Sequence, residues 1–136
     1  YLGEFSMTVE DFRLFRMIFL KTRVRINQKE GANMINDEIL AIKDRFIETL
    51  HPEKIILFGS YAKDTFNENS DYDFYLVMPD STSNILHVTQ EAYICLLDMN
   101  RKPVDIVVNT ASKFLERAKR MTLERTVQNE GVVLYA

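Results

Sequence analysis

Short apolar runs alternate with longer helical stretches along most of this 136-residue chain, and this alternation limits the possible folds more than any other feature. Four runs are too short for helices and rich in strand-forming residues, so we expect strands there. These runs span residues 54–58, 73–78, 104–108 and 132–135. Three stretches have apolar residues at helical spacing, and they span residues 35–50, 84–99 and 112–130. The alternation predicts an α/β (α+β) protein in which helices pack on a mixed β-sheet of about four strands.

The ends of these helices have signals of their own. His51-Pro52 ends the first helix, because proline cannot continue it. Thr122 is expected to divide the last stretch into two pieces, and Gly131 to stop the second piece. A further helix is expected to begin at Tyr61-Ala62-Lys63, directly after the first strand.

A polar segment at residues 28–33 divides the chain into residues 1–33 and residues 34–136, which we expect to be separate units. The first part has aromatic residues at helical spacing, namely Phe12, Phe15 and Phe19. Because the chain begins with Tyr rather than Met, this helical part is either a native extension or was introduced with an expression vector. We expect it to pack on its own domain or on a second copy, giving a homo-oligomer; a membrane-surface or RNA-binding helix is the alternative.

Composition excludes several classes of protein. The single cysteine, Cys95, allows neither a disulfide within the chain nor a Cys-rich zinc site, and fits a reducing, cytoplasmic location. The two histidines, His51 and His87, lack metal-ligand spacing. A net charge of −3 gives no global basic field for nucleic acid, and no apolar run reaches the roughly 18 residues of a membrane span.

Gly59-Ser60 stands between the first strand and the helix expected after it. A strand that turns through glycine into a helix N-terminus exposes backbone N–H groups, which favour phosphate oxygens. The Ser60 hydroxyl is a good N-cap and could add a contact to phosphate. An ordinary strand–turn–helix junction has the same pattern, so this motif is weak by itself.

Three aspartates are the candidate metal ligands. Asp71 and Asp73 are two residues apart at the start of a strand, so their side chains share a face and repel unless a cation lies between them. Asp105 lies inside the apolar run Val104–Val108, where a buried carboxylate would need a cation or strong donors. Three such carboxylates suit Mg²⁺. A solvated strand edge or a turn cap is the alternative for each.

The run from Gly59-Ser60 to Ser70-Asp71-Tyr72-Asp73, with the later Asp105 strand, resembles the signature of the DNA polymerase beta-like nucleotidyltransferase superfamily. The short chain resembles the minimal bacterial members, and the match covers roughly residues 34–136. The resemblance implies that Gly59, Ser60, Lys63 and Ser70 bind a nucleoside triphosphate. It also implies that Asp71, Asp73 and Asp105 are catalytic, bind two Mg²⁺ ions and help to activate the attacking hydroxyl.

The resemblance further implies transfer of a nucleoside monophosphate, AMP from ATP, to a hydroxyl acceptor with release of pyrophosphate. Minimal members are often partners of a small helical HEPN toxin, and some adenylylate it, so a toxin protein is the implied acceptor. The sequence departs from the family where Ala62-Lys63-Asp64 replaces the common Ala-Arg-Gly, which loses the planar fork of arginine and adds a carboxylate.

This departure leaves room for a second interpretation, a weakly active or inactive antitoxin that binds a partner protein stoichiometrically. A small-molecule transferase is a third, although no residues are left over for a substrate domain. The basic residues Lys113, Arg117, Lys119, Arg120 and Arg125 are read as a solvated helix face, or else as a patch for an acidic partner or RNA.

If residues 34–136 are a complete domain, deletion of residues 1–33 should leave a protein with a cooperative thermal transition and an unchanged strand signal in circular dichroism. An unfolded product would contradict this division of the chain.

Overall fold

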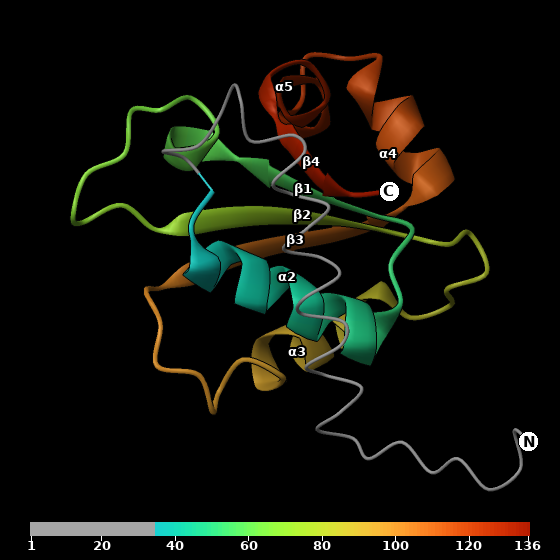
Figure 1. Cartoon of the computed structure of the whole chain (residues 1–136). Coiled ribbons are helices and arrows are strands. Elements are labelled where there is room, and N and C mark those ends of the chain that lie inside the picture. Colours follow the sequence, from blue (N-terminus) through green and yellow to red (C-terminus); the bar gives the residue numbers. More distant parts are fainter. Residues whose placement is uncertain (1–34) are drawn as a thin grey trace, which may run out of the picture. The chain divides into compact units, whose positions relative to one another are not determined.

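The computed structural model describes residues 35–136, so the helix predicted within residues 1–33 lies outside the described residues (Figure 1). The elements follow in chain order as α2 (Asp37–Leu50), β1 (Lys54–Phe58), the 3-10 helix η2 (Gly59–Tyr61), β2 (Tyr72–Met78), α3 (Ile85–Ile94), β3 (Val104–Thr110), α4 (Ala111–Ala118), α5 (Leu123–Glu130) and β4 (Val132–Tyr135). The four strands form one sheet in the order β3-β2-β1-β4.

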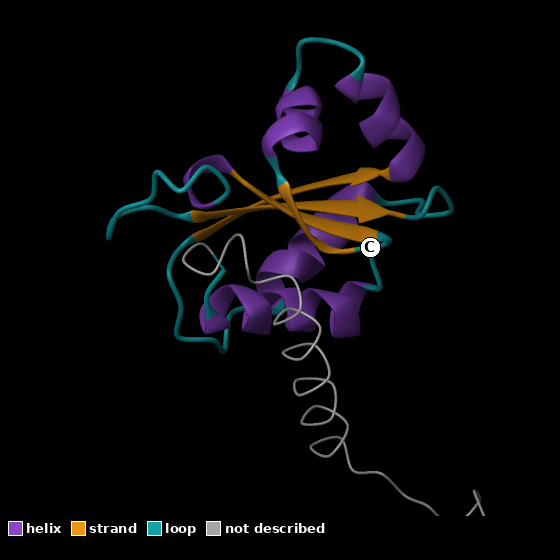
Figure 2. Ribbon diagram, turned by 45° about the horizontal axis from the view of Figure 1, so that its top comes forward, coloured by secondary structure: helices purple, strands orange, loops and turns teal. Residues whose placement is uncertain are grey.

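The sheet is mixed. β1 pairs antiparallel with both β2 and β4, whereas β2 and β3 run parallel and are joined through α3. Figures 1 and 2 show α2 and α3 on one face of the sheet and α4 and α5 on the other. The expected mixed four-stranded sheet with packed helices is therefore confirmed.

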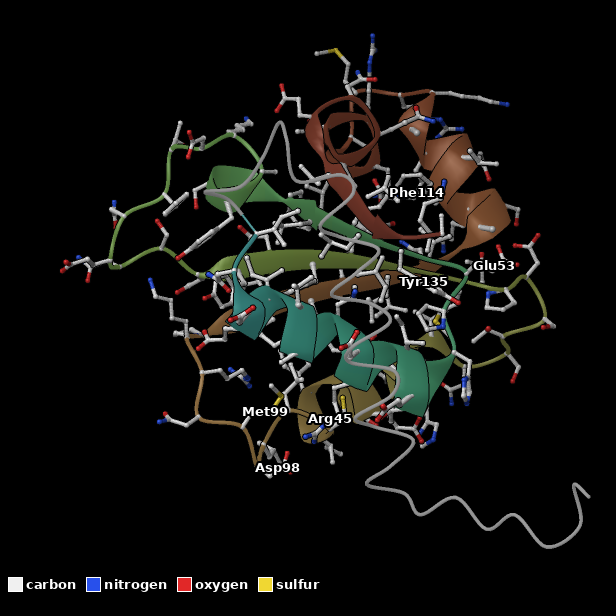
Figure 3. The ribbon with its side chains drawn as sticks, viewed as in Figure 1. Arg45, Glu53, Asp98, Met99, Phe114 and Tyr135 are labelled. Carbon is white, nitrogen blue, oxygen red and sulfur yellow. The ribbon has the colours of Figure 1, made fainter. Side chains whose placement is uncertain are left out.

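Alternation along the strands gives the sheet two apolar faces of unequal size. The larger core lies toward α2 and α3 and includes Ile39, Phe46, Leu57, Phe74, Leu76, Leu96 and Ile106. The smaller core lies toward α4 and α5 and consists of Ile56, Tyr75, Val77, Phe114 and Val127. Figure 3 shows Phe114 of α4 on this second side. Along β2, odd-numbered residues therefore face α4 and α5.

The helix expected over residues 84–99 is shorter than predicted, because α3 ends at Ile94. Beyond it the backbone tightens into turns in which Leu97 N–H donates to the Ile94 carbonyl. The Arg45 guanidinium donates to the Cys95 carbonyl at 2.8 Å and pairs with Asp98 at 2.7 Å, which holds this turn against α2 (Figure 3). Apolar spacing continued past the helix because the turn residues Leu96 and Met99 also pack inward.

The predicted division of residues 112–130 is confirmed: α4 ends at Ala118, and α5 begins after its N-cap residue Thr122. No helix among residues 35–136 is long and apolar enough to cross a bilayer.

A buried polar network fixes α4 and α5 to the sheet. Glu124 of α5 is only 2% exposed, and its Oε1 accepts hydrogen bonds from the Tyr75 hydroxyl at 3.0 Å and from Arg117 Nε at 2.9 Å. Tyr75 in turn accepts a hydrogen bond from the Asn109 side-chain amide at 3.0 Å. Burial favours the neutral form of Glu124, but hydrogen bonds from its own backbone, Arg117 and Tyr75 together lower its pKa. The network therefore ties β2, β3, α4 and α5 through one carboxylate.

Tyr75→Phe should lower the free energy of unfolding by about 1–2 kcal/mol, because the buried Glu124 carboxylate loses one of its hydrogen bonds and the Asn109 side-chain amide loses its acceptor. Urea denaturation followed by circular dichroism measures this. Tyr135→Phe is the matched control, since the Tyr135 hydroxyl has no hydrogen-bond partner among the described residues. Equal losses in the two variants would contradict the role of the network.

Candidate active site

The parallel pairing of β2 with β3 places two of the predicted carboxylates side by side. Asp73 and Asp105 are partners in the register, so both side chains project from the same face of the sheet. This is the face toward α4 and α5, since Asp73 alternates with the core residues Tyr72 and Phe74. Asp73 is half-buried and Asp105 is exposed, at the end of the face where β1 leads into η2.

Of the three predicted carboxylates, Asp73 is the one whose pKa is raised. Burial, followed by the charges of Asp105 and Asp71, raises the pKa of Asp73 from an ordinary value of 3.8 to about 6. The influence of Asp71 indicates that it lies close to Asp73, although it stands one residue before the strand and is exposed. The structure thus pairs Asp73 with Asp105, and Asp71 adds a smaller contribution to the raised pKa of Asp73.

Gly59 closes the site from the β1 side. Phe58, the residue before it, pairs with Asp73 in the sheet, and Gly59 has a positive φ of 73°. A Cβ atom added to Gly59 would collide with the carboxylate of Asp73. Both the backbone conformation and the close approach therefore require glycine here. The Gly59-Ser60 turn lies directly against the carboxylate of Asp73.

The helix expected to begin at Tyr61-Ala62-Lys63 does not form, and that prediction is wrong. Only the three-residue η2 is present. The N–H groups of Ala62 and Lys63 both donate to the Gly59 carbonyl, and Thr65 N–H donates to the Ser60 carbonyl at 3.0 Å. These bonds close a compact turn instead of a continuing helix. The turn can offer backbone N–H groups to an anion, but it lacks the dipole of a longer helix.

Two of the predicted nucleotide ligands have other partners. Lys63 Nζ forms an ion pair with Glu130 at 2.7 Å. The Ser70 hydroxyl accepts a hydrogen bond from Asn67 N–H at 2.9 Å within its own loop. The partners of these two side chains are Glu130 and Asn67, whereas the backbone of Gly59 lies against the Asp73 carboxylate.

The backbone explains why the loop tolerates Asp64. Its φ is +56°, in the left-handed region that glycine adopts freely and that aspartate tolerates better than most residues. The family's glycine and this chain's aspartate therefore suit the same backbone, and the departure changes charge more than shape.

Lys102 contacts the loop after η2, and no sequence pattern pointed to this role. Its ammonium group donates to the Tyr61 hydroxyl at 3.0 Å and to the Glu68 carbonyl at 3.2 Å, and its backbone N–H donates to Glu38 at 3.1 Å. It thus fastens the loop after η2 to the start of β3 and to α2. These partners lie 34 to 64 residues away along the chain, so no local motif could reveal them.

The aromatic residues near the turn belong to the core. Tyr61 and Tyr72 are 3% and 2% exposed, and their rings are in edge contact with centroids 4.7 Å apart. Tyr61 also stacks on Phe66 at 4.4 Å. Buried rings of this kind support the turn from beneath and are not open for stacking on a base.

The donor set of the site fits a divalent cation. Carboxylate oxygens are the ligands that Mg²⁺ prefers, and burial, followed by the negative charges of Asp105 and Asp71, raises the pKa of Asp73. Within residues 35–136, however, no three His, Cys, Asp or Glu side chains form a compact metal cage. Asp71 and Asp105 are exposed and can rotate toward Asp73 at little cost. The carboxylates could therefore hold a cation after side-chain rotation.

Known proteins share parts of this sequence and of this fold. The profile of a family described as "Nucleotidyltransferase domain" matches residues 39–129. A crystal structure of a toxin-antitoxin with AMP-PNP has a TM-score of 0.54 and 23% identity, covering 74% of each chain, which supports the fold alone. A Sulfolobus solfataricus protein with a provisional nucleotidyltransferase assignment has a TM-score of 0.48 and 16% identity, covering 98% of this chain and 90% of its own. No curated protein sequence gives a significant match.

Asp73→Asn should stabilise the protein near pH 7.5 in the absence of divalent ions. The folded state holds the Asp73 proton more tightly than the unfolded chain does, so folding loses stability as pH rises from about 4 to 6. We expect a gain of about 1–2 kcal/mol for the variant above pH 6, allowing for solvent screening, and none near pH 4. Thermal unfolding across this pH range measures it.

Asp80→Asn at the other end of β2 is the control for this experiment. The Asp80 carboxylate accepts the Ser112 N–H, which lowers its pKa, so its replacement should bring no gain. A destabilised Asp73→Asn at pH 7.5 would show that the three carboxylates do not repel in the folded state.

Proposed function

Since the chain belongs to the nucleotidyltransferase domain family and is a transferase enzyme, we propose that it transfers AMP from ATP to a hydroxyl acceptor and releases pyrophosphate. One observation carries this proposal, the pairing of Asp73 with Asp105 on parallel strands beside the Gly59 turn. Carboxylates gathered against a glycine turn suit a reaction that depends on neutralising phosphate charge.

In the proposed reaction, Gly59 and Ser60 lie along the phosphates and their backbone N–H groups contact phosphate oxygens. The acceptor hydroxyl oxygen forms a bond to the α-phosphorus, the bond from that phosphorus to the oxygen bridging to the β-phosphorus breaks, and pyrophosphate leaves. Asp105, the exposed carboxylate, accepts the hydroxyl proton on a carboxylate oxygen.

Asp71, Asp73 and Asp105 would hold two Mg²⁺ ions. When bound, these ions would neutralise triphosphate charge and stabilise the attacking and leaving oxygens. Asp73 must lose its proton to bind a cation, and its raised pKa of about 6 still leaves it ionised at neutral pH. Gly59 keeps the site beside Asp73 free of a side chain.

We propose a protein hydroxyl as the acceptor, on a HEPN-type toxin. The support is the structural similarity to a toxin-antitoxin with AMP-PNP, a pairing of a protein complex with an ATP analogue. The net charge of −3 also disfavours a long nucleic acid as acceptor.

A second candidate, a stoichiometric binding module without catalysis, is favoured by one observation. Lys63 of the turn loop is paired with Glu130 rather than directed toward the carboxylates. Calorimetry of ATP with Mg²⁺ discriminates between the two: absence of binding at millimolar ATP would favour the binding module.

Asp73→Asn and Asp105→Asn should each lower AMP transfer by about 10²–10⁴-fold, the range for loss of a general base or of an essential charge. Transfer of label from [α-³²P]ATP to co-purified partner protein, together with pyrophosphate release, measures this. Asp80→Asn, the same substitution at the far end of β2, should retain activity. Undiminished turnover in Asp73→Asn would rule out the proposed mechanism.

A further inference from the structure

An ion pair connects the turn loop of the candidate site with the end of α5. Lys63 Nζ lies 2.7 Å from Glu130 Oε2, and the two side chains are 49% and 50% exposed. Lys63 follows the Gly59-Ser60 turn by only a few residues, whereas Glu130 is the last residue of α5. α5 packs on the face of the sheet that carries Asp73, and the loop that carries Lys63 begins at Gly59, which lies against the Asp73 carboxylate.

Both ends of this pair are held by the surrounding structure. On the α5 side, Gly131 N–H donates to the Val127 carbonyl at 2.9 Å, and a Cβ atom on Gly131 would meet Ile56, so this end of the helix lies tightly on β1. On the loop side, Lys63 N–H donates to the Gly59 carbonyl at 3.2 Å. The ion pair therefore joins two anchored backbones, which lowers the entropy cost of forming it.

Lys63 is also the only basic residue in the turn loop. Residues 59–71 contain one lysine and three acidic residues, Asp64, Glu68 and Asp71. Lys102, which reaches this loop from the start of β3, is engaged by the Tyr61 hydroxyl and the Glu68 carbonyl. An incoming polyphosphate would thus find one ammonium group in the loop, and that group already has a carboxylate partner.

We propose that Glu130 and the phosphates of the nucleotide compete for Lys63, so that Glu130 sets the nucleotide affinity of the site. The proposal rests on the nucleotidyltransferase function proposed above. In the free protein the carboxylate holds Lys63 against α5. Nucleotide binding breaks this pair, transfers the ammonium group to phosphate oxygens and leaves Glu130 solvated. Part of the phosphate interaction is therefore offset by the lost ion pair.

The test is calorimetric titration of the full 136-residue chain with α,β-methylene ATP and Mg²⁺, a pair that binds without transfer. Glu130→Gln keeps the size of the side chain and removes its charge, and should lower the dissociation constant about two- to fivefold, the scale of an exposed ion pair. Lys63→Met should raise it. The gain in Glu130→Gln should shrink at high salt, where exposed charges are screened.

A double-mutant cycle makes the test specific. In a Lys63→Met background, Glu130→Gln should have little effect, because no ammonium group is left to compete for. Glu116→Gln is the matched control. It removes a carboxylate of α4 that pairs with Arg120, and it should leave binding unchanged. Unchanged or weaker binding in Glu130→Gln would overturn the proposal, as would an equal gain in both backgrounds. Failure of the wild-type chain to bind the analogue would instead count against the proposed function.

Discussion

The pairing of β2 with β3 holds two negatively charged side chains, Asp73 and Asp105, next to each other, and the rest of the structure must accommodate this. The parallel register of β2 and β3 puts Asp73 beside Asp105, and Asp71 adds a third negative charge. Carboxylates directly opposite one another destabilise a sheet. The backbone hydrogen bonds and the apolar residues of both strands must therefore fix the register against this repulsion. Phe74, Leu76, Ile106 and Val108, the residues that do so, are all buried in the core toward α2 and α3.

The two faces of the sheet contribute unequally to the stability of the fold. The α2–α3 side carries the larger core and supplies most of the burial that stabilises the fold. The α4–α5 side covers Tyr75 and Val77 but not Asp105, so one end of that face stays accessible. The buried Glu124 network attaches α4 and α5 without help from the charged end of the sheet. The Glu124 network and the carboxylates of the candidate site thus occupy different ends of the same face, as expected where repelling groups need solvent or a cation.

The sequence was most informative where a short-range pattern decides the structure. Strand runs such as Lys54–Phe58 were predictable because they are apolar, rich in strand-forming residues and too short for a helix. The prediction for residues 84–99 ran too long because Leu96 and Met99 keep helical spacing while packing from a turn. The helix after Gly59 was mispredicted because Asp64 has a left-handed backbone, with a φ of 56°, which ends the helical turn after Lys63. The roles of Glu124 and Lys102 could not be predicted from the sequence. Their partners are distant in the chain, and a lone charged residue looks like a surface residue.

The same distinction explains how this chain departs from its family at Lys63-Asp64. Asp64 has a left-handed backbone, which glycine adopts freely and aspartate tolerates, so either residue suits this turn. What changes is electrostatic: a carboxylate enters the loop, and the lysine that replaces arginine has Glu130 as its partner. A lysine ammonium forms single point contacts and exchanges partners more readily than a bidentate guanidinium does. Gly59 keeps its close approach to Asp73 beside this loop, and under the proposal made above the Lys63–Glu130 pair would control the nucleotide affinity of the site.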